Sequence, residues 1–195
     1  MIQLSAKEIL EKVQEKYQGS KRLNHILGVA NLAKELAIKL GADSKKAYIA
    51  GLLHDYIKYE TTKEMINIIK DKEIIDKFKN SPQIYHAYAS AKVAEEVFGI
   101  SDLEILNAIK YHVYGRINMS LLEEILVIAD YCEDSREYES SKEVRKILDS
   151  GNFYLALYLC NKNSIDNVLE KGYSPLEEQY TILEQIGKKV TKWNY

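Results

Sequence analysis

Apolar residues recur along most of the chain at the three- and four-residue spacing of amphipathic helices. Segments with this spacing begin after residues that commonly cap helices, and several end at a glycine. The pattern predicts about nine helices, which begin near Ser5, Ser20, Asp43, Ser81, Ser101, Ser120, Ser140, Asn152 and Ser174. No stretch alternates apolar and polar residues over strand length, and no Asn-Gly or Asp-Gly hairpin turn occurs. The sequence therefore predicts an all-α fold.

Nothing in the pattern divides the chain into parts. The 195 residues include only 2 prolines and 9 glycines, and no Pro-, Gly- or Ser-rich linker or internal repeat is present. A chain of this length fits one domain. We predict a single domain over residues 1–195, with its core motifs within 20–136 and helices in 140–195 that complete the fold.

The charge balance excludes several classes of partner. Lys and Arg number 27 against 29 Asp and Glu, so no general attraction to nucleic acid or to an anionic membrane is expected. No apolar run approaches the roughly 18 residues that span a membrane, and we expect no signal peptide. Cys132 and Cys160 form no CxxC pair, so neither a zinc ribbon nor a disulfide framework is predicted. We predict a cytoplasmic protein, and a homodimer is a hypothesis without an assigned interface.

The candidate chemistry lies in the histidines and in two aspartates. His54 directly precedes Asp55, and Asp130 follows the apolar run 125–129. A carboxylate beside such a run is expected to be partly buried, which requires a cation, a proton or several donors. Imidazole and carboxylate ligands suit zinc, iron, manganese or nickel. A lone histidine is more often a surface or core residue, so these residues leave a metal site and an incidental arrangement equally open.

Five motifs in order, with Arg136 after the last, make the interpretation more specific. They are 22–29 (RLNHILGV), 51–58 (GLLHDYIK), 108–116 (AIKYHVYGR), 119–123 (MSLLE) and 128–133 (IADYCE). In these motifs the sequence resembles the YqeK family of the HD superfamily of metal-dependent phosphohydrolases, over roughly residues 16–190. The resemblance implies a helical bacterial enzyme that hydrolyses diadenosine tetraphosphate symmetrically to two ADP. It also implies iron as cofactor, with manganese or another divalent metal and one or two ions left open.

The resemblance also implies roles for individual residues. The metal ligands would be His25, His54, Asp55 and Asp130, and Asp55 would also orient the nucleophile. His86 and His112 would act as catalytic groups on the phosphates, with a second metal ion left open. The expected substrate-binding residues are Arg22, His25, Lys58, His86, His112, Arg116, Arg136 and Ser174. Helical spacing supports two of these residues, because Lys58 lies at i+4 from His54 and Arg22 lies three residues before His25, so each can share a helical face with that histidine. Ser174 is expected at a helix N-terminus, which can bind an anion.

The chain departs from the family pattern at Ile26, Val113, Tyr114 and Asp134. None of these positions carries an expected ligand, so the substrate is less firmly implied than the metal. Two alternatives therefore stay open. One is a phosphohydrolase of another substrate, either a nucleotidase or a cyclic-nucleotide phosphodiesterase. The other is a non-catalytic regulatory module that binds nucleotide or metal.

Overall fold

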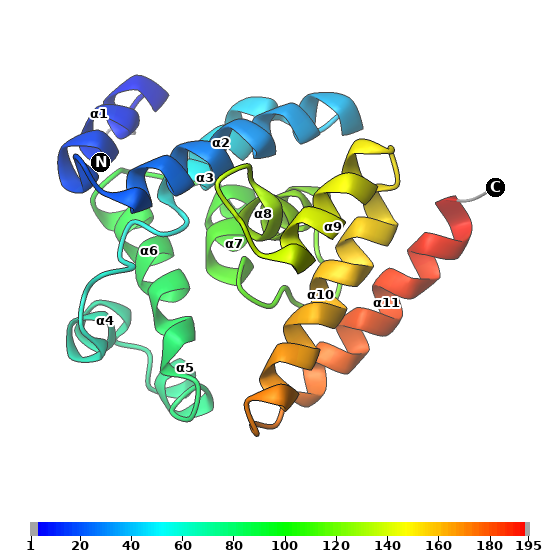
Figure 1. Cartoon of the computed structure of the whole chain (residues 1–195). Coiled ribbons are helices and arrows are strands. Elements are labelled where there is room, and N and C mark those ends of the chain that lie inside the picture. The colour runs from blue at the N-terminus through cyan, green and yellow to red at the C-terminus, as the bar shows by residue number, and fades with distance from the viewer. Residues whose placement is uncertain (1–3, 194–195) are drawn as a thin grey trace.

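The computed structural model describes residues 4–193, which contain eleven α-helices, one short 3₁₀ helix and no strand (Figure 1). The helices are α1 (Ala6–Tyr17), α2 (Lys21–Leu40), α3 (Ser44–Leu53), α4 (Thr62–Ile69), α5 (Lys72–Lys77), η1 (Pro82–Ile84), α6 (Tyr85–Glu96), α7 (Leu103–Tyr111), α8 (Leu121–Cys132), α9 (Glu139–Asp149), α10 (Phe153–Glu170) and α11 (Glu177–Trp193). The all-α prediction is confirmed. No helix in this part of the chain is both long enough and apolar enough to cross a membrane.

The main core is built around α8, which is buried along most of its length and contacts α2, α3, α7, α9 and α10. Helices α2 and α3 approach each other closely at Gly51, where a Cβ would lie 2.5 Å from Cα of Ala30. This close packing brings the end of α3 beside the first half of α2. The core therefore packs α2, α3 and α8 against one another, and each of these helices contains residues of the five sequence motifs.

Two further groups of helices flank this core. A smaller apolar cluster that includes Met65, Phe78 and Tyr85 joins α4, the end of α5 and the start of α6. Helices α10 and α11 pack side by side on the other side of the molecule, where Figure 1 draws them in orange and red.

The number of helices exceeds the prediction because residues 62–77 form α4 and α5, where only a restart of the chain after Thr61 was expected. Two predicted caps are also wrong. Ser81 makes no capping hydrogen bond and precedes η1, and Asp102 caps α7 in place of Ser101 by accepting from the amide of Glu104 at 2.9 Å.

The end of one helix near the predicted site also differs from the prediction. Helix α3 ends at Leu53, whereas the i+4 relation expected between His54 and Lys58 requires the helix to continue. The Tyr17 hydroxyl donates to the carbonyl oxygens of Asp55 and Tyr56, at 3.1 and 2.9 Å. The amide of Ile57 donates to Ser90 Oγ at 3.1 Å. These tertiary hydrogen bonds satisfy the backbone of a turn, which local periodicity does not reveal.

Helix α11 begins at Glu177, so Ser174 lies outside it. The amide of Leu176 instead donates to Gln179 Oε1, at 2.9 Å, at the start of this helix. The prediction of a helix N-terminus at Ser174 is therefore wrong.

Candidate metal centre

Five helices bring all four histidines and two aspartates to one place. His25 lies on α2, His54 and Asp55 at the end of α3, and His86 on α6. His112 directly follows α7, and Asp130 lies near the end of α8. All four imidazoles and Asp55 are buried, and Asp130 is partly exposed. The six residues that the sequence singled out for metal or catalysis thus form a single cluster.

The first half of the cluster surrounds Nε2 of His25. This atom lies 3.3 Å from His54 Nε2, 3.1 Å from Asp130 Oδ1 and 3.7 Å from Asp55 Oδ2. His54 Nε2 lies 3.6 Å from the same oxygen of Asp55 and 3.7 Å from Asp130 Oδ1. Two imidazole nitrogens and two carboxylate oxygens therefore converge on a common point.

The second half uses the other oxygen of Asp55. Asp55 Oδ1 lies 3.0 Å from His86 Nε2 and 3.7 Å from His112 Nε2, and these two nitrogens are 3.2 Å apart. The orientation of His86 makes no hydrogen bond to Oδ1, which is buried without a hydrogen-bond partner. The two oxygens of Asp55 consequently face two different pairs of histidines.

The hydrogen bonds of the other ring nitrogens fix which atom faces the cluster. Nδ1 of His54, His86 and His112 lies 2.7, 2.5 and 2.8 Å from the carbonyl oxygens of Gly51, Gln83 and Ile109. A carbonyl oxygen only accepts, so each Nδ1 carries a hydrogen, and Nε2 of a neutral ring then presents a lone pair. Lone pairs about 3 Å apart repel one another unless a cation or a proton lies between them. This arrangement fits a metal ion on the Nε2 side.

The protonation states agree with this fit. Burial lowers the pKa of His54 to about 4 and that of His112 to about 3, so both rings are neutral near pH 7. Burial alone would raise the pKa of Asp55, but His54, His86 and Lys58 hold it well below its usual range. Neutral imidazoles and ionised carboxylates are ligands for a divalent metal of the iron, manganese or zinc type. The cluster therefore fits a divalent metal.

Three of the predicted cationic side chains contact the cluster. Arg22 Nη1 lies 2.5 Å from Asp55 Oδ2, and Arg136 Nη2 lies 2.7 Å from Asp130 Oδ1. Lys58 Nζ lies 3.4 Å from Asp55 Oδ1 and 3.0 Å from His86 Nε2. The structure thus places positive charge on both sides of the carboxylates.

A cleft of about 650 Å³ opens above the cluster. Three residues of the cluster, His86, His112 and Asp130, line this cleft together with Lys58 and Arg136. Much of the remaining wall is polar and comes from α10 and from the segment before and within α9; it includes Tyr138, Ser140, Ser141, Asn163, Ser164, Asp166, Asn167, Glu170 and Lys171. The volume lies in the range of small-molecule sites.

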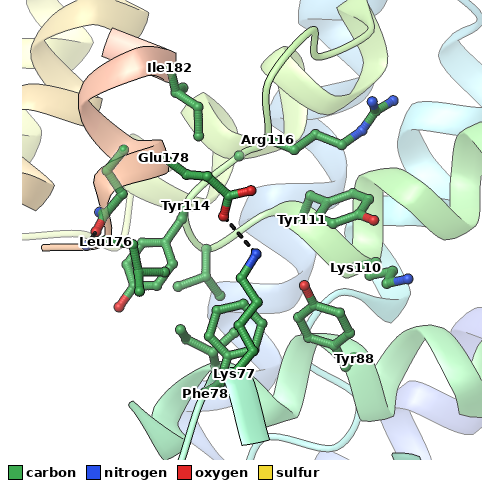
Figure 2. A pocket seen from close by; sticks show the side chains of 14 residues that line it. Lys77, Phe78, Tyr88, Lys110, Tyr111, Tyr114, Arg116, Leu176, Glu178 and Ile182 are labelled. Carbon is green, nitrogen blue, oxygen red and sulfur yellow. Dashed lines mark hydrogen bonds and ion pairs between the residues drawn. The ribbon is translucent and has the colours of Figure 1, made fainter. Parts of the chain in front are cut away.

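Arg116 and Ser174 do not line this cleft. Arg116 Nε donates to the buried Glu123 at 2.9 Å, and the side chain faces a separate cavity of about 50 Å³. Figure 2 shows this cavity, where Lys77 and Glu178 pair at 2.7 Å beside a group of tyrosines. The structure therefore brings six expected ligand or catalytic residues and three expected cations together, but not Arg116 or Ser174.

Glu133 is a site residue that the sequence interpretation did not select. Its Oε1 lies 3.0 Å from His25 Nδ1, and its side chain is buried. Glu133 lies three residues after Asp130, beyond the same apolar run 125–129. The burial argument used for Asp130 would therefore have applied to it as well.

The fold and the cluster define a helical protein with a histidine–aspartate centre suited to a divalent metal. A family model described as "HD domain" matches residues 22–134, and the chain belongs to this family. Bis(5'-nucleosyl)-tetraphosphatase, symmetrical, from Bacillus subtilis (strain 168) is 39% identical over 152 residues, which are 77% of this chain and 81% of that protein. The protein of the same name from Staphylococcus aureus (strain NCTC 8325 / PS 47) is 34% identical over 153 residues, covering 77% and 79%.

A solved structure supports the same assignment. The crystal structure of a "predicted HD superfamily hydrolase involved in NAD metabolism" from Clostridium acetobutylicum superimposes with a TM-score of 0.87. The two chains are 34% identical, and the match covers 96% of this chain and 100% of the other. The similarity therefore extends well beyond the residues of the family model, into α9, α10 and α11.

Acidification should destabilise the metal-free protein. The folded state keeps His54 and His112 neutral, because burial lowers their pKa to about 4 and about 3. The unfolded chain binds these protons near pH 6.5, so between about pH 7 and pH 5 each histidine should cost roughly 2 kcal/mol of unfolding free energy. Burial lowers the pKa of His25, but Asp130 and Glu133 raise it overall, which offsets part of the loss.

Urea unfolding of chelator-treated protein across this pH range measures the effect. The His112→Gln variant removes one of the two neutral histidines and should lose less stability than the wild type over the same range. A wild-type stability that stays constant on acidification would contradict the buried neutral state of these rings.

Proposed function

We propose that this protein hydrolyses diadenosine tetraphosphate symmetrically, giving two ADP, in a metal-dependent reaction. The observation that carries the proposal is the cluster of four imidazoles and two carboxylates, which borders a nucleotide-sized cleft and is flanked by Lys58 and Arg136. Two relatives that match most of this chain are named symmetrical bis(5'-nucleosyl)-tetraphosphatases, which supports this substrate.

We further propose that the cluster holds two ions, with Asp55 shared between them. One would be held by His25, His54, Asp130 and Asp55 Oδ2, and the other by Asp55 Oδ1 with the remaining two histidines. Iron is our choice of metal, because imidazole and carboxylate donors suit it and the family resemblance implies it. A bound divalent ion lowers the pKa of a water molecule and polarises a phosphoryl oxygen.

The chain's own residues would supply positioning and charge. Arg136 presents a guanidinium fork at the edge of the cleft, which matches the geometry of a phosphate. Lys58 would exchange its contacts with Asp55 and His86 for a phosphate oxygen of the substrate. Arg22 contacts Asp55 and would keep that carboxylate oriented. Positioning and charge neutralisation are the main requirements of phosphoryl transfer.

In the proposed roles, His86 and His112 hold the second ion. Their Nδ1 atoms donate to backbone carbonyls, so their Nε2 atoms face the cluster and are placed to bind an ion. Direct contact of these two imidazoles with phosphate is the alternative. The neutral His112 ring would then be a weaker partner for an anion than Lys58 and Arg136.

We also place the reaction in the cytoplasm, with neither nucleic acid nor a membrane as partner. Both cysteines are free and buried, which suits a reducing compartment. A homodimer stays a prediction without an assigned surface.

The test is product analysis with purified protein that has been treated with a chelator. Diadenosine tetraphosphate is incubated with iron(II), manganese(II), zinc(II) or no added metal, and the products are separated by chromatography. We expect ADP as the sole product, formed only with metal. ATP plus AMP would overturn symmetrical cleavage. Intact dinucleotide, together with orthophosphate release in a parallel incubation with a mononucleotide, would instead indicate a nucleotidase.

A further inference from the structure

His25 is anchored differently from the other three histidines. Nδ1 of His54, His86 and His112 faces a backbone carbonyl three residues earlier in the chain. Nδ1 of His25 instead faces Oε1 of Glu133, at 3.0 Å, from a residue 108 positions later. One imidazole of the cluster is therefore held by a charged side chain from another element.

The carboxylate of Glu133 is itself held in place. Ser135 donates to it twice, from its amide to Oε2 at 2.7 Å and from Oγ to Oε1 at 2.5 Å. Arg145 fixes the backbone of this segment by donating to the carbonyl oxygens of Cys132 and Glu133, at 2.8 and 2.5 Å. Because the carboxylate of Glu133 accepts both hydrogen bonds from Ser135, it also acts as the acceptor toward His25. The hydrogen between Glu133 and His25 is therefore carried by Nδ1. Nε2 of His25 is then directed at the cluster.

Gly28 provides the room for this carboxylate. It lies on α2, three residues after His25, and a Cβ at this position would overlap Oε2 of Glu133 and lie 3.1 Å from its Cδ. Glycine in a helix interior costs roughly 0.5–1 kcal/mol relative to alanine. The helix thus carries an unfavourable residue where the carboxylate approaches it.

We propose that Glu133 is a positioning residue for metal binding, and that Gly28 admits its carboxylate to His25. Glu133 holds the ring with Nε2 toward the cluster and increases the basicity of that nitrogen through the hydrogen bond to Nδ1. The inference rests on the metal-ligand role proposed above for His25. It does not depend on which phosphate compound the protein hydrolyses.

The first test is the affinity of metal-free protein for manganese(II), measured by titration for wild type and for Glu133→Ala. Loss of such an outer partner typically weakens metal binding about 10–100-fold, which is the change expected here. Glu124→Ala is the matched control, because Glu124 is another buried carboxylate, near the start of α8, but it pairs with Lys189 away from the cluster. It should lower the melting temperature of the metal-free protein and leave manganese affinity unchanged.

The second test keeps Glu133 and moves its carboxylate. Gly28→Ala should weaken manganese binding in the wild-type background, because the added methyl group displaces the carboxylate. In the Glu133→Ala background the same change should have no further effect on affinity, because nothing remains to be displaced. Without metal, the melting temperature of this double variant should be higher than that of Glu133→Ala alone, because alanine replaces glycine in a helix.

The outcomes separate this inference from the proposed function. Wild-type affinity in Glu133→Ala, or an equal loss from Gly28→Ala in both backgrounds, would overturn it. A wild-type protein that binds no manganese would overturn it together with the metal role of His25. Failure to cleave diadenosine tetraphosphate would overturn only the proposed function, since hydrolysis is not the quantity measured.

Discussion

Replacing Asp55 by asparagine should abolish hydrolysis of diadenosine tetraphosphate, with a loss of roughly 10³-fold or more in kcat/KM, about 4 kcal/mol of transition-state stabilisation. The two oxygens of Asp55 face two different pairs of histidines. Asparagine keeps the volume of the side chain but replaces one oxygen with an NH₂ group and removes the charge. Both halves of the cluster therefore lose the Asp55 carboxylate, and one of them also loses the oxygen atom that faces it.

The same change should destabilise the metal-free protein. Arg22 and Lys58 both pair with Asp55, and both would lose that partner. Breaking a fully buried pair costs about 3–5 kcal/mol, and because these two side chains are partly exposed we expect roughly 1–3 kcal/mol here. Urea unfolding of chelator-treated protein measures this cost apart from metal binding.

Asp102→Asn is a suitable control for Asp55→Asn. Asp102 also forms an ion pair, with Lys46 at 2.8 Å, but it caps α7 outside the cluster. Asparagine preserves the cap, so activity and metal content should match the wild type. If Asp55→Asn retained activity within tenfold of wild type at saturating metal, Asp55 would not be shared by the two halves of the cluster.

Several helix starts could be predicted because they are set by neighbouring residues. Ser5 and Ser120 form the two reciprocal hydrogen bonds of a capping box with the glutamates three residues later, and Ser20 caps α2. These bonds span three residues, so the sequence alone contains both partners. Helices α4 and α5 were not assigned even though Thr61 and Asp71 provide comparable caps, because both helices are short.

The candidate site likewise contains contacts that helical spacing predicts and contacts that depend on residues distant in sequence. Arg22 and His25 were expected to share one face of a helix, and both do contact Asp55. Lys58 was expected near the site because it would share a helical face with His54. It does lie at the site and contacts Asp55, but from a turn beyond α3. That turn depends on Tyr17 and Ser90, which are distant in sequence.

Arg116 shows the limit of inference from motifs. It lies four residues after His112, yet the chain turns away after α7, and its guanidinium pairs with Glu123. Glu123 also completes the capping box of α8. Sequence proximity to a candidate ligand therefore did not predict which charge reaches the cleft, because the partner that holds Arg116 belongs to the next helix.

Adding a divalent metal to the chelated protein should raise its melting temperature by about 5–10 °C at a free concentration near 100 times the dissociation constant. Binding at that concentration stabilises the folded state by roughly 2.7 kcal/mol, and each kcal/mol shifts a chain of this size by about 2–4 °C. The physical reason is the metal-free cluster itself. It holds facing Nε2 atoms 3.2 and 3.3 Å apart and a buried carboxylate oxygen without a hydrogen bond.

The choice of ion provides the control for this shift. Manganese(II), iron(II) and zinc(II) accept imidazole ligands, whereas calcium prefers oxygen ligands and should raise the melting temperature much less. His86→Ala removes a ligand from one half of the cluster and leaves His25, His54 and Asp130 in place, so it should retain one bound ion of two by native mass spectrometry. An equal shift with calcium would contradict binding through the imidazoles. Two ions bound to His86→Ala would contradict the assignment of His86 to the second half of the cluster.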